Sequence, residues 1–443
     1  MKSAGGRRSS FRAASKFLIA LTTPHKIEAT KSAIRKGRKT IYEASFEHEG
    51  VFVKVDILNK GKKGWNIYEV KNSTKLDDVY IKDTALQYYV LKGAGIKLDR
   101  AYVVLLNKAY IKKGALEIKK LFISEDVTDR VLGQQKFVGE QIPKLKAMLA
   151  AKMPDIPLGK YCEKPYLCDF KGHCWKDLPE YSVISLRGKG IDKYKLYESG
   201  IVHLADVPAE SLNKDQRLQL EAFLKKKKII DKKAIREFIS TLWYPLYFLD
   251  FETFESPIPI YDKARPTHKI PFQYSLHYIK RKGGKVYHSE YLARPGTDHR
   301  KELLKKLLAE IPEKACVLAY KKSVEKSALN LLAEQFPRFR SAIEKITDNL
   351  RDLMVPFQNR AFYHYKMKGA YSIKAVLPVI DPTLSYSELE IANGNMAMVE
   401  YARMNSSKDP AEIEEIRRSL IKYCTLDTLA MVRLLDKLQT MSK

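Results

Sequence analysis

An apolar run that ends in two carboxylates, at residues 246–252, constrains the fold of this 443-residue chain most strongly. Asp250 and Glu252 follow the run at alternate positions. An uninterrupted apolar strand is typical of the centre of an α/β sheet, and alternate residues of a strand share one face. Two neighbouring like charges raise each other's pKa, and a divalent cation relieves the repulsion. The run therefore predicts a central strand with a metal site; the alternative is an edge strand with two solvated acids.

The net charge predicts a polyanionic partner. Lysine and arginine number 80 against 52 acidic residues, which gives a formal charge of +28. We expect nucleic acid, DNA more than RNA, rather than a membrane, because no amphipathic basic helix with an aromatic face stands out. No apolar run approaches the ~20 residues that span a bilayer. A generally basic proteome is the alternative explanation. The five cysteines are an odd number and do not resemble a secreted disulfide framework, so we expect a cytoplasmic protein.

Periodicity predicts an α/β protein. Hairpin and strand patterns lie at 42–47, 51–58, 65–71 and 101–106, with helical patterns at 83–91, at 118–153 and, interrupted, at 411–440. A helix at 196–198 that stops at Gly200 before a new helix start at 204–206 resembles a helix-hairpin-helix module, which grips nucleic-acid backbones. Four lysines at 225–228 favour the same reading, although a solvated charge run is equally common.

A tyrosine and an acid near the end of the chain add to the C-terminal set. Tyr423 and Asp427 are four residues apart, a spacing that places both on one face of a helix. Asp427 can supply an oxygen ligand to the metal of Asp250 and Glu252, and Tyr423 can orient or deprotonate a water. Alone, such a pair is more often a surface hydrogen bond than a site.

Residues 245–443 resemble the DnaQ-like exonucleases of the DEDD class, in the subtype marked by Tyr-x-x-x-Asp. They are more closely similar to an uncharacterised domain that follows RecB-like nuclease modules in many bacterial proteins, through the stretches 247–253, 271–276 and 369–374. The resemblance implies an RNase H-like fold and two-metal hydrolysis of phosphodiesters, with Mg²⁺ or Mn²⁺, from a 3′ end. It also implies that Asp250 bridges both metals, that Glu252 and Asp427 each hold one, and that Tyr423 positions the water.

The resemblance further implies a middle acid, which is Glu325. Lys321 and Val324 stand where such a set normally has an asparagine and an aromatic residue, so altered substrate contacts are expected. Asp352 is interpreted either as a supporting acid or as part of a helix surface.

A second acid set lies in the predicted hairpin. Glu69 and Lys71 share a strand face, and the hairpin brings Asp56 within reach of them. An acid pair with a lysine resembles the core of PD-(D/E)XK nucleases of the RecB-like branch, which implies Glu43 as an extra ligand and Gln87 on the following helix. A surface salt bridge is the alternative. Leu91 occupies the position where the RecB-like motif usually has a tyrosine, so an impaired module is a further alternative.

Three cysteines, Cys162, Cys168 and Cys174, have the spacing C-x5-C-x5-C, with His173 beside the last. This spacing is similar to the cysteine tail of iron–sulfur RecB-like nucleases, whose fourth cysteine comes from the N-terminal helix; no cysteine precedes Cys162 in this sequence. The alternatives are a [4Fe–4S] cluster, a zinc site completed by His173, and a remnant.

The sequence thus predicts four parts: a flexible basic segment at 1–39, a PD-(D/E)XK domain with its cysteine tail at 40–178, a helical linker at 179–243, and a DnaQ-like domain at 244–443. A metal-dependent 3′–5′ exonuclease is the leading hypothesis. A nucleic-acid-binding scaffold with degenerate nuclease folds and a structural iron–sulfur protein are its rivals.

Overall fold

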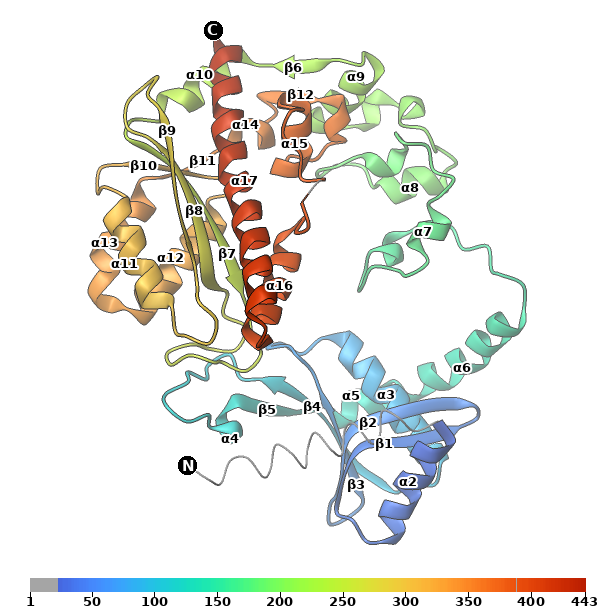
Figure 1. Ribbon diagram of the computed structural model, residues 1–443. Coiled ribbons are helices and arrows are strands. Elements are labelled where there is room, and N and C mark those ends of the chain that lie inside the picture. Colours follow the sequence, from blue (N-terminus) through green and yellow to red (C-terminus); the bar gives the residue numbers. More distant parts are fainter. Residues whose placement is uncertain (1–22, 388) are drawn as a thin grey trace. The chain divides into compact units, whose positions relative to one another are not determined.

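A computed structural model describes residues 23–387 and 389–443 (Figure 1). The described residues form a mixed α/β structure, as the sequence predicts. Contacts divide the chain into two units. Unit 1 comprises the chain up to Ile156 together with Ser256–Thr267, and unit 2 comprises Pro157–Glu255 and His268–Lys443. The cysteine segment and the linker therefore belong to unit 2, and the finer division into four parts stays a prediction.

Unit 1 is built on a five-stranded sheet in the order β1-β2-β3-β4-β5. Its strands are β1 (Thr40–His48), β2 (Val51–Lys60), β3 (Trp65–Val70), β4 (Leu98–Leu106) and β5 (Phe122–Asp126). Only β3 and β4 run parallel in this sheet, because α3 (Asp78–Gly93) carries the chain back between them. The predicted strands from 42 to 106 and the helix at 83–91 are confirmed.

The stretch 118–153 differs from the predicted helix. It contains α4 (Ile118–Leu121), then β5, then α5 (Thr128–Gly133) and α6 (Gln135–Ala150). β5 pairs antiparallel with β4, from Tyr102 opposite Asp126 to Leu106 opposite Phe122. The neighbouring strand supplies backbone hydrogen bonds that the local sequence does not reveal, so tertiary pairing overrides the helical pattern.

The predicted flexible segment 1–39 is in part a helix. Residues 1–22 lie outside the described residues, and the chain then forms α2 (Thr23–Arg35). The backbone N–H of Ser45 donates to Thr30 Oγ1 at 2.9 Å, and Ile34 packs against the core of unit 1. Packing of this kind stabilises a short helix whose polar sequence gives little signal of its own.

The first part of unit 2 consists of short helices, several of which pack around a small apolar cluster. They are η1 (Lys160–Cys162), α7 (Lys171–Cys174), η2 (Val183–Ser185), α8 (Lys193–Glu198), η3 (Leu204–Asp206), η4 (Ala209–Ser211), α9 (Lys214–Leu224) and α10 (Lys232–Ser240). Gly200 follows α8 at φ +88°, the left-handed conformation in which glycine ends a helix, as predicted. β6 (Lys228–Ile230) pairs antiparallel with β12 (Phe362–His364), which joins the linker to the C-terminal part.

The main sheet of unit 2 has the order β11-β10-β7-β8-β9. Its strands are β7 (Leu246–Phe254), β8 (Ile270–Ile279), β9 (Val286–Leu292), β10 (Cys316–Ala319) and β11 (Leu350–Asp352). β7 lies at the centre, parallel to β10 and antiparallel to β8. Phe248 and Leu249, on opposite faces of β7, are both fully buried. The predicted central strand is confirmed, and the edge-strand alternative is excluded.

Helices cover this sheet (Figure 1). They are α11 (Arg300–Glu310), α12 (Ser323–Gln335), η5 (Pro337–Phe339), α13 (Arg340–Asp348), α14 (Val355–Gln358), η6 (Tyr365–Met367), α15 (Ile373–Ile380), α16 (Gly394–Ser406) and α17 (Pro410–Ser442).

The prediction that the last helix is interrupted is wrong, because α17 runs for 33 residues. Asp409 caps its first turn by accepting from Ala411 N at 2.9 Å. Buried side chains from Leu420 to Leu438 hold the helix on the sheet along its length. Neither α17 nor any other helix in the described ranges is long and apolar enough to cross a membrane.

Candidate functional site

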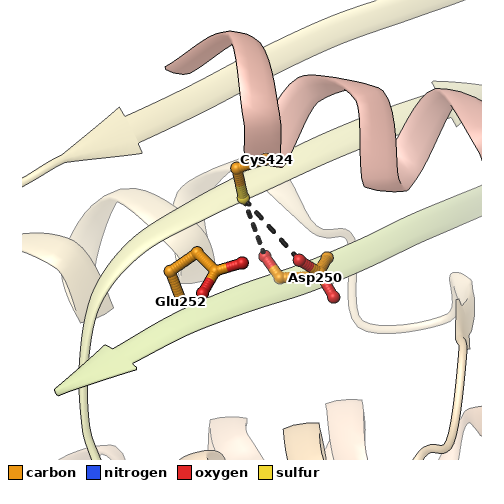
Figure 2. A group of neighbouring side chains, drawn as sticks. All are labelled: Asp250, Glu252 and Cys424. Carbon is orange, nitrogen blue, oxygen red and sulfur yellow. Dashed lines mark hydrogen bonds between the residues drawn. The ribbon is translucent and has the colours of Figure 1, made fainter. Parts of the chain in front are cut away.

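The central strand of unit 2 presents Asp250 and Glu252 together (Figure 2). Both share the face of β7 that carries Phe248, which belongs to the same apolar cluster as the buried side chains of α17. Glu252 is buried and Asp250 is half-buried. The alternation of the strand therefore brings the two acids to one covered face, as predicted from the sequence.

Helix α17 adds Tyr423, Cys424 and Asp427 to this face. Cys424 Sγ lies 3.7 Å from Asp250 Oδ2 and 3.9 Å from the Asp250 carbonyl oxygen (Figure 2). The ligand atoms of Asp250, Glu252 and Cys424 all lie within 4.8 Å of one another. No sequence argument singled out Cys424 as part of the site, because a cysteine in an apolar helix is ordinarily a core residue.

Glu325 approaches the same acids from the first turn of α12. It is 2% exposed, and its Oε2 atom has no hydrogen-bond partner among the described residues. Its negative charge contributes to the raised pKa of Asp250 and of Glu252. Buried polar atoms without a partner are rare in folded proteins, so this oxygen is suited to a ligand.

Asp352 shapes the turn that leads into α12. It ends β11 and accepts from the backbone N–H groups of Lys321 at 2.9 Å, Lys322 at 3.1 Å and Met354 at 3.0 Å. Lys321 has a left-handed φ of 70°, and these bonds hold that conformation. The helix-surface interpretation of Asp352 is therefore wrong; the residue positions the turn before Glu325.

Burial disfavours the charged form of all four carboxylates, and neighbouring acids add to this effect for Asp250, Glu252 and Glu325. Burial, with the charges of Asp427, Glu252 and Glu325, raises the pKa of Asp250 well above its usual value. Burial and neighbouring acids raise the pKa of Glu252 to about 8 and that of Glu325 to about 8. Burial raises the pKa of Asp427 to about 6, against an opposing hydrogen bond from Tyr386. A cation bound among these groups would remove the penalty of ionising them.

Two residues outside the predicted set complete the site. The hydroxyl of Tyr386 donates to Asp427 Oδ1 at 2.5 Å. The ammonium of Lys374 lies 5.3 Å from the ring centre of Tyr386 and 5.4 Å from that of Tyr423, and its charge lowers the pKa of Glu252 and Asp427. Lys374 is the last residue of the stretch 369–374, so its resemblance to the uncharacterised domain was the sequence feature that could have identified it. No sequence feature pointed to Tyr386.

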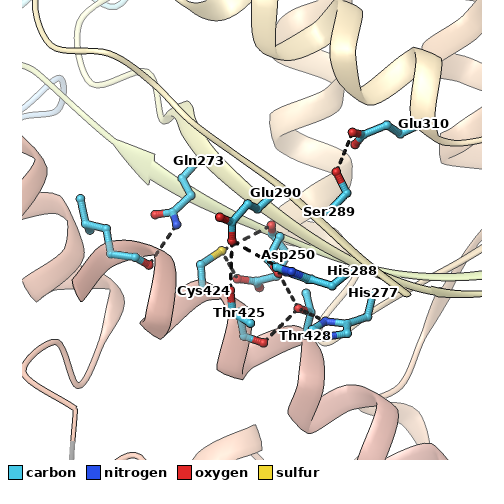
Figure 3. A network of polar contacts seen from close by, with 12 residues as sticks. Asp250, Gln273, His277, His288, Ser289, Glu290, Glu310, Cys424, Thr425 and Thr428 are labelled. Atoms are coloured by element: carbon cyan, nitrogen blue, oxygen red, sulfur yellow. Dashed lines mark hydrogen bonds and ion pairs between the residues drawn. The ribbon is translucent and has the colours of Figure 1, made fainter. Parts of the chain in front are cut away.

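A hydrogen-bonded network fixes α17 against β8 and β9 beside the carboxylates (Figure 3). Thr428 Oγ1 lies 2.6 Å from Ser275 Oγ and 2.7 Å from His277 Nδ1. Ser275 Oγ also lies 2.9 Å from His288 Nε2. Burial and the neighbouring His288 lower the pKa of His277 to about 4, so this ring is neutral near pH 7. The network sets the register of Asp427, the residue before Thr428.

In unit 1 the predicted acid and lysine residues also converge. Val70 N donates to Asp56 Oδ2 at 2.8 Å, which joins β2 to β3. Lys71 Nζ donates to Glu69 Oε1 at 2.7 Å, and Gln87 Nε2 donates to Glu69 Oε2 at 2.8 Å. The hairpin and α3 thus bring together Asp56, Glu69, Lys71 and Gln87.

Two details of the unit 1 set were not predicted. Asp83, one turn before Gln87 on α3, accepts from Lys71 Nζ at 2.6 Å. Its ion pair and that of Glu69 raise the pKa of Lys71 above its usual value against the effect of burial. Glu43, the predicted extra ligand, forms an ion pair with Lys54 and has a left-handed φ of 54°. Its charge still contributes to the raised pKa of Asp56, whose main cause is burial.

The cysteine trio spans three environments. Cys162 at the end of η1 is buried, Cys168 is half-buried, and Cys174 at the end of α7 is exposed. In the described ranges, the one group of three or more side chains close enough to share a metal is that of Asp250. The three cysteines and His173 are not part of it, and the predictions for this segment stay predictions.

Comparisons with known proteins cover parts of the chain. Residues 247–372 match DUF2779, a domain of unknown function; this range contains Asp250, Glu252 and Glu325 and ends before Tyr423 and Asp427. The chain is 27% identical, over 227 residues, to an uncharacterized protein of Mycoplasma pneumoniae, a homolog of MG366. The match covers 46% of this chain and 34% of that protein, so it spans about a third of the relative's length. No solved structure matches the chain significantly.

Proposed function

We propose that unit 2 is a metal-dependent nuclease with an RNase H-like fold, similar to the DnaQ-like exonucleases, that hydrolyses nucleic acid from a 3′ end. The observation that carries the proposal is that Glu252 on β7, Glu325 on α12 and Asp427 on α17 all lie near enough to Asp250 for their charges to raise its pKa. The charge of +28 suits a polyanionic substrate. We expect DNA more than RNA, and a cytoplasmic protein.

The donor set fits divalent cations such as Mg²⁺ or Mn²⁺. These ions prefer oxygen ligands, and Asp250 and Glu252 offer carboxylate oxygens within 4.8 Å of each other, with Glu325 and Asp427 near enough for their charges to act on both. The buried Oε2 of Glu325 has no partner among the described residues, which is the feature a ligand would complete. Asp250 would be the shared ligand, with Glu252, Glu325 and Asp427 around it. Bound pairs of such ions stabilise the attacking and the leaving oxygen of a phosphodiester.

The side chains orient the water that attacks the phosphorus. Burial and the charge of Asp427 raise the pKa of Tyr423 above its usual value, so its phenol stays protonated at neutral pH. Tyr423 therefore orients the water as a hydrogen-bond partner and does not remove its proton. The water oxygen forms the new bond to phosphorus and loses a proton to solvent, the bond to the 3′ oxygen of the preceding nucleotide breaks, and that oxygen takes up a proton from solvent, so that no proton is gained or lost overall. The products are a nucleoside 5′-monophosphate and a strand one nucleotide shorter.

Unit 1 supports a second, separate candidate. The meeting of Asp56, Glu69 and Lys71 is the arrangement expected of a RecB-like PD-(D/E)XK module. Lys71 forms ion pairs with both Glu69 and Asp83. These pairs favour an impaired site, because they neutralise the positive charge that would act on a substrate or a water. A [4Fe–4S] cluster at Cys162, Cys168 and Cys174 stays a proposal; iron and zinc analysis of protein purified without oxygen would test it.

End-labelled single strands of DNA and RNA test the proposal. With Mg²⁺ or Mn²⁺ we expect stepwise shortening from the 3′ end, lost in Asp250→Asn and Asp427→Asn. Asp436→Asn is the matched control, since Asp436 is an exposed acid on the same helix as Asp427 and outside the site. If no metal supports cleavage while binding persists, the proposal is wrong and the scaffold alternative holds.

A further inference from the structure

A surface patch of unit 2 gathers aromatic rings and lysines from two distant segments. Tyr181 and Phe223 stack at 4.6 Å between ring centres, and Tyr365 lies 6.0 Å from Tyr181. Lys226 Nζ lies 5.0 Å from the ring centre of Phe223 and 5.6 Å from those of Tyr181 and Tyr365. The linker and the C-terminal part both contribute to this aromatic–lysine patch.

The patch is positively charged. Lys226, Lys228, Lys366 and Lys368 are all exposed. Strand pairing places Lys228 opposite His364, and the charges of Lys366 and Lys228 add to burial in lowering the pKa of His364. Of the four lysines, Lys368 has an ion pair, with Glu180 at 3.1 Å, so most of the charge is available to an anion.

We infer that the aromatic–lysine patch binds single-stranded nucleic acid, through phosphates at its lysines and bases at its half-buried rings. Proteins that hold single strands without sequence preference combine a basic surface with aromatic rings on which bases stack. An acidic peptide would use the lysines alone, and a duplex would not expose its bases to the rings. The inference rests on the proposed function for its substrate class.

The chain places this patch near the carboxylates. Lys368 lies in the patch, and Lys374 lies beside Glu252 and Asp427. The six residue steps from Lys368 to Lys374 span at most about 22 Å even when fully extended. A strand held at the patch can therefore reach the proposed cleavage site without a large movement of the protein.

The test measures binding and not cleavage. Full-length Asp250→Asn protein in EDTA is titrated with a fluorescein-labelled oligothymidylate at several salt concentrations. When Lys226→Gln and Lys366→Gln are added to this variant, binding is expected to weaken roughly tenfold. The slope of the logarithm of the binding constant against the logarithm of the salt concentration is expected to fall in magnitude by about 1.4, since each phosphate contact on a single strand contributes about 0.7. Lys226→Arg with Lys366→Arg is expected to restore both.

Two lysines of the same loop provide the matched control. Lys225 and Lys227 already pair with Glu221, at 2.8 and 3.3 Å. Lys225→Gln with Lys227→Gln removes the same charge and is expected to change affinity less than twofold. Tyr365→Leu, but not Tyr365→Phe, is expected to weaken binding roughly tenfold through lost stacking.

Three outcomes would overturn the inference: an unchanged salt slope in the Lys226 and Lys366 variant, an equal loss in the control pair, or equal affinity for a duplex of the same length. Because binding is measured without cleavage, the binding result can be interpreted even if the protein has no nuclease activity. Conversely, nuclease activity in a protein whose patch variants bind normally would contradict this inference and leave the proposed function standing.

Discussion

The two units both bury carboxylates but neutralise them differently. In unit 1, Lys71 lies between Glu69 and Asp83, with ion-pair distances of 2.7 and 2.6 Å. In unit 2, burial and the charges of Asp427, Glu252 and Glu325 raise the pKa of Asp250. Lys374 lowers the pKa of Glu252 and Asp427, while its ammonium donates to the carbonyl oxygen of Ala392. Unit 1 therefore contains its own counter-ion, whereas unit 2 is arranged for one that comes from outside.

This difference bears on which unit performs chemistry. Both oxygens of Glu69 accept hydrogen bonds, from Lys71 and Gln87. Glu325 Oε2 has no such partner in the described part of the chain. A buried carboxylate whose oxygens both accept hydrogen bonds serves mainly to stabilise the fold, whereas a buried carboxylate oxygen without a hydrogen-bond partner can bind a ligand. Four measurements test this contrast.

The largest expected effect is on cleavage. Asp250→Asn keeps the shape of the side chain but removes the charge shared by the proposed metals, and we expect the rate to fall about 10³-fold. Lys71→Ala is expected to leave the rate within about threefold. Single-turnover rates on an end-labelled strand measure both. If Lys71→Ala abolishes cleavage and Asp250→Asn does not, the chemistry belongs to unit 1.

Metal binding should stabilise unit 2 alone. At a Mn²⁺ concentration about 100-fold above its dissociation constant, linkage predicts a gain of about 3 kcal/mol. Hydrogen exchange measured by mass spectrometry should show slower exchange in β7 and α17, with β3 and α3 unchanged. Equal protection of both units would contradict the contrast.

The metal-free protein should lose stability as pH rises. The pKa of Glu252 is raised to about 8 in the folded chain, above its value in the unfolded chain. Between about pH 4.5 and 8 the folded state therefore binds more protons than the unfolded state, so the free energy of unfolding falls by about 1.4 kcal/mol for each pH unit. Urea unfolding in EDTA across this range measures the fall. Saturating Mn²⁺ should abolish it, and a rise in EDTA would contradict the electrostatic account.

Smaller effects are expected from single polar contacts. Lys71→Met should destabilise unit 1 by about 1–2 kcal/mol, because Glu69 and Asp83 lose their shared cation. Tyr386→Phe should cost about 1 kcal/mol through the lost bond to Asp427, which Mn²⁺ should partly restore. Chemical denaturation of each variant, with and without metal, measures these values, and an effect of Mn²⁺ on Lys71→Met alone would reverse the assignment.

The sequence predicted the residues whose signal is local. Alternation along β7 placed Asp250 and Glu252 on one face, and helical spacing placed Tyr423 and Asp427 on another element. The hairpin brought Asp56 to the strand that holds Glu69. Residues joined only by tertiary contacts gave no such signal: Tyr386 follows an irregular segment, and Asp83 is one of several acids in and before α3.

The charge, the central strand and most of the acids of both sets could be read from the sequence, because strand and helix periodicity depend on neighbouring residues. The charge balance of those acids depends on tertiary contacts. The ion pairs of Lys71 and the unpartnered Oε2 of Glu325 depend on side chains that approach from different elements. So does the pairing of β5 with β4, which overrode a helical pattern. Burial and charge balance are properties of the assembled fold, and no local pattern encodes them.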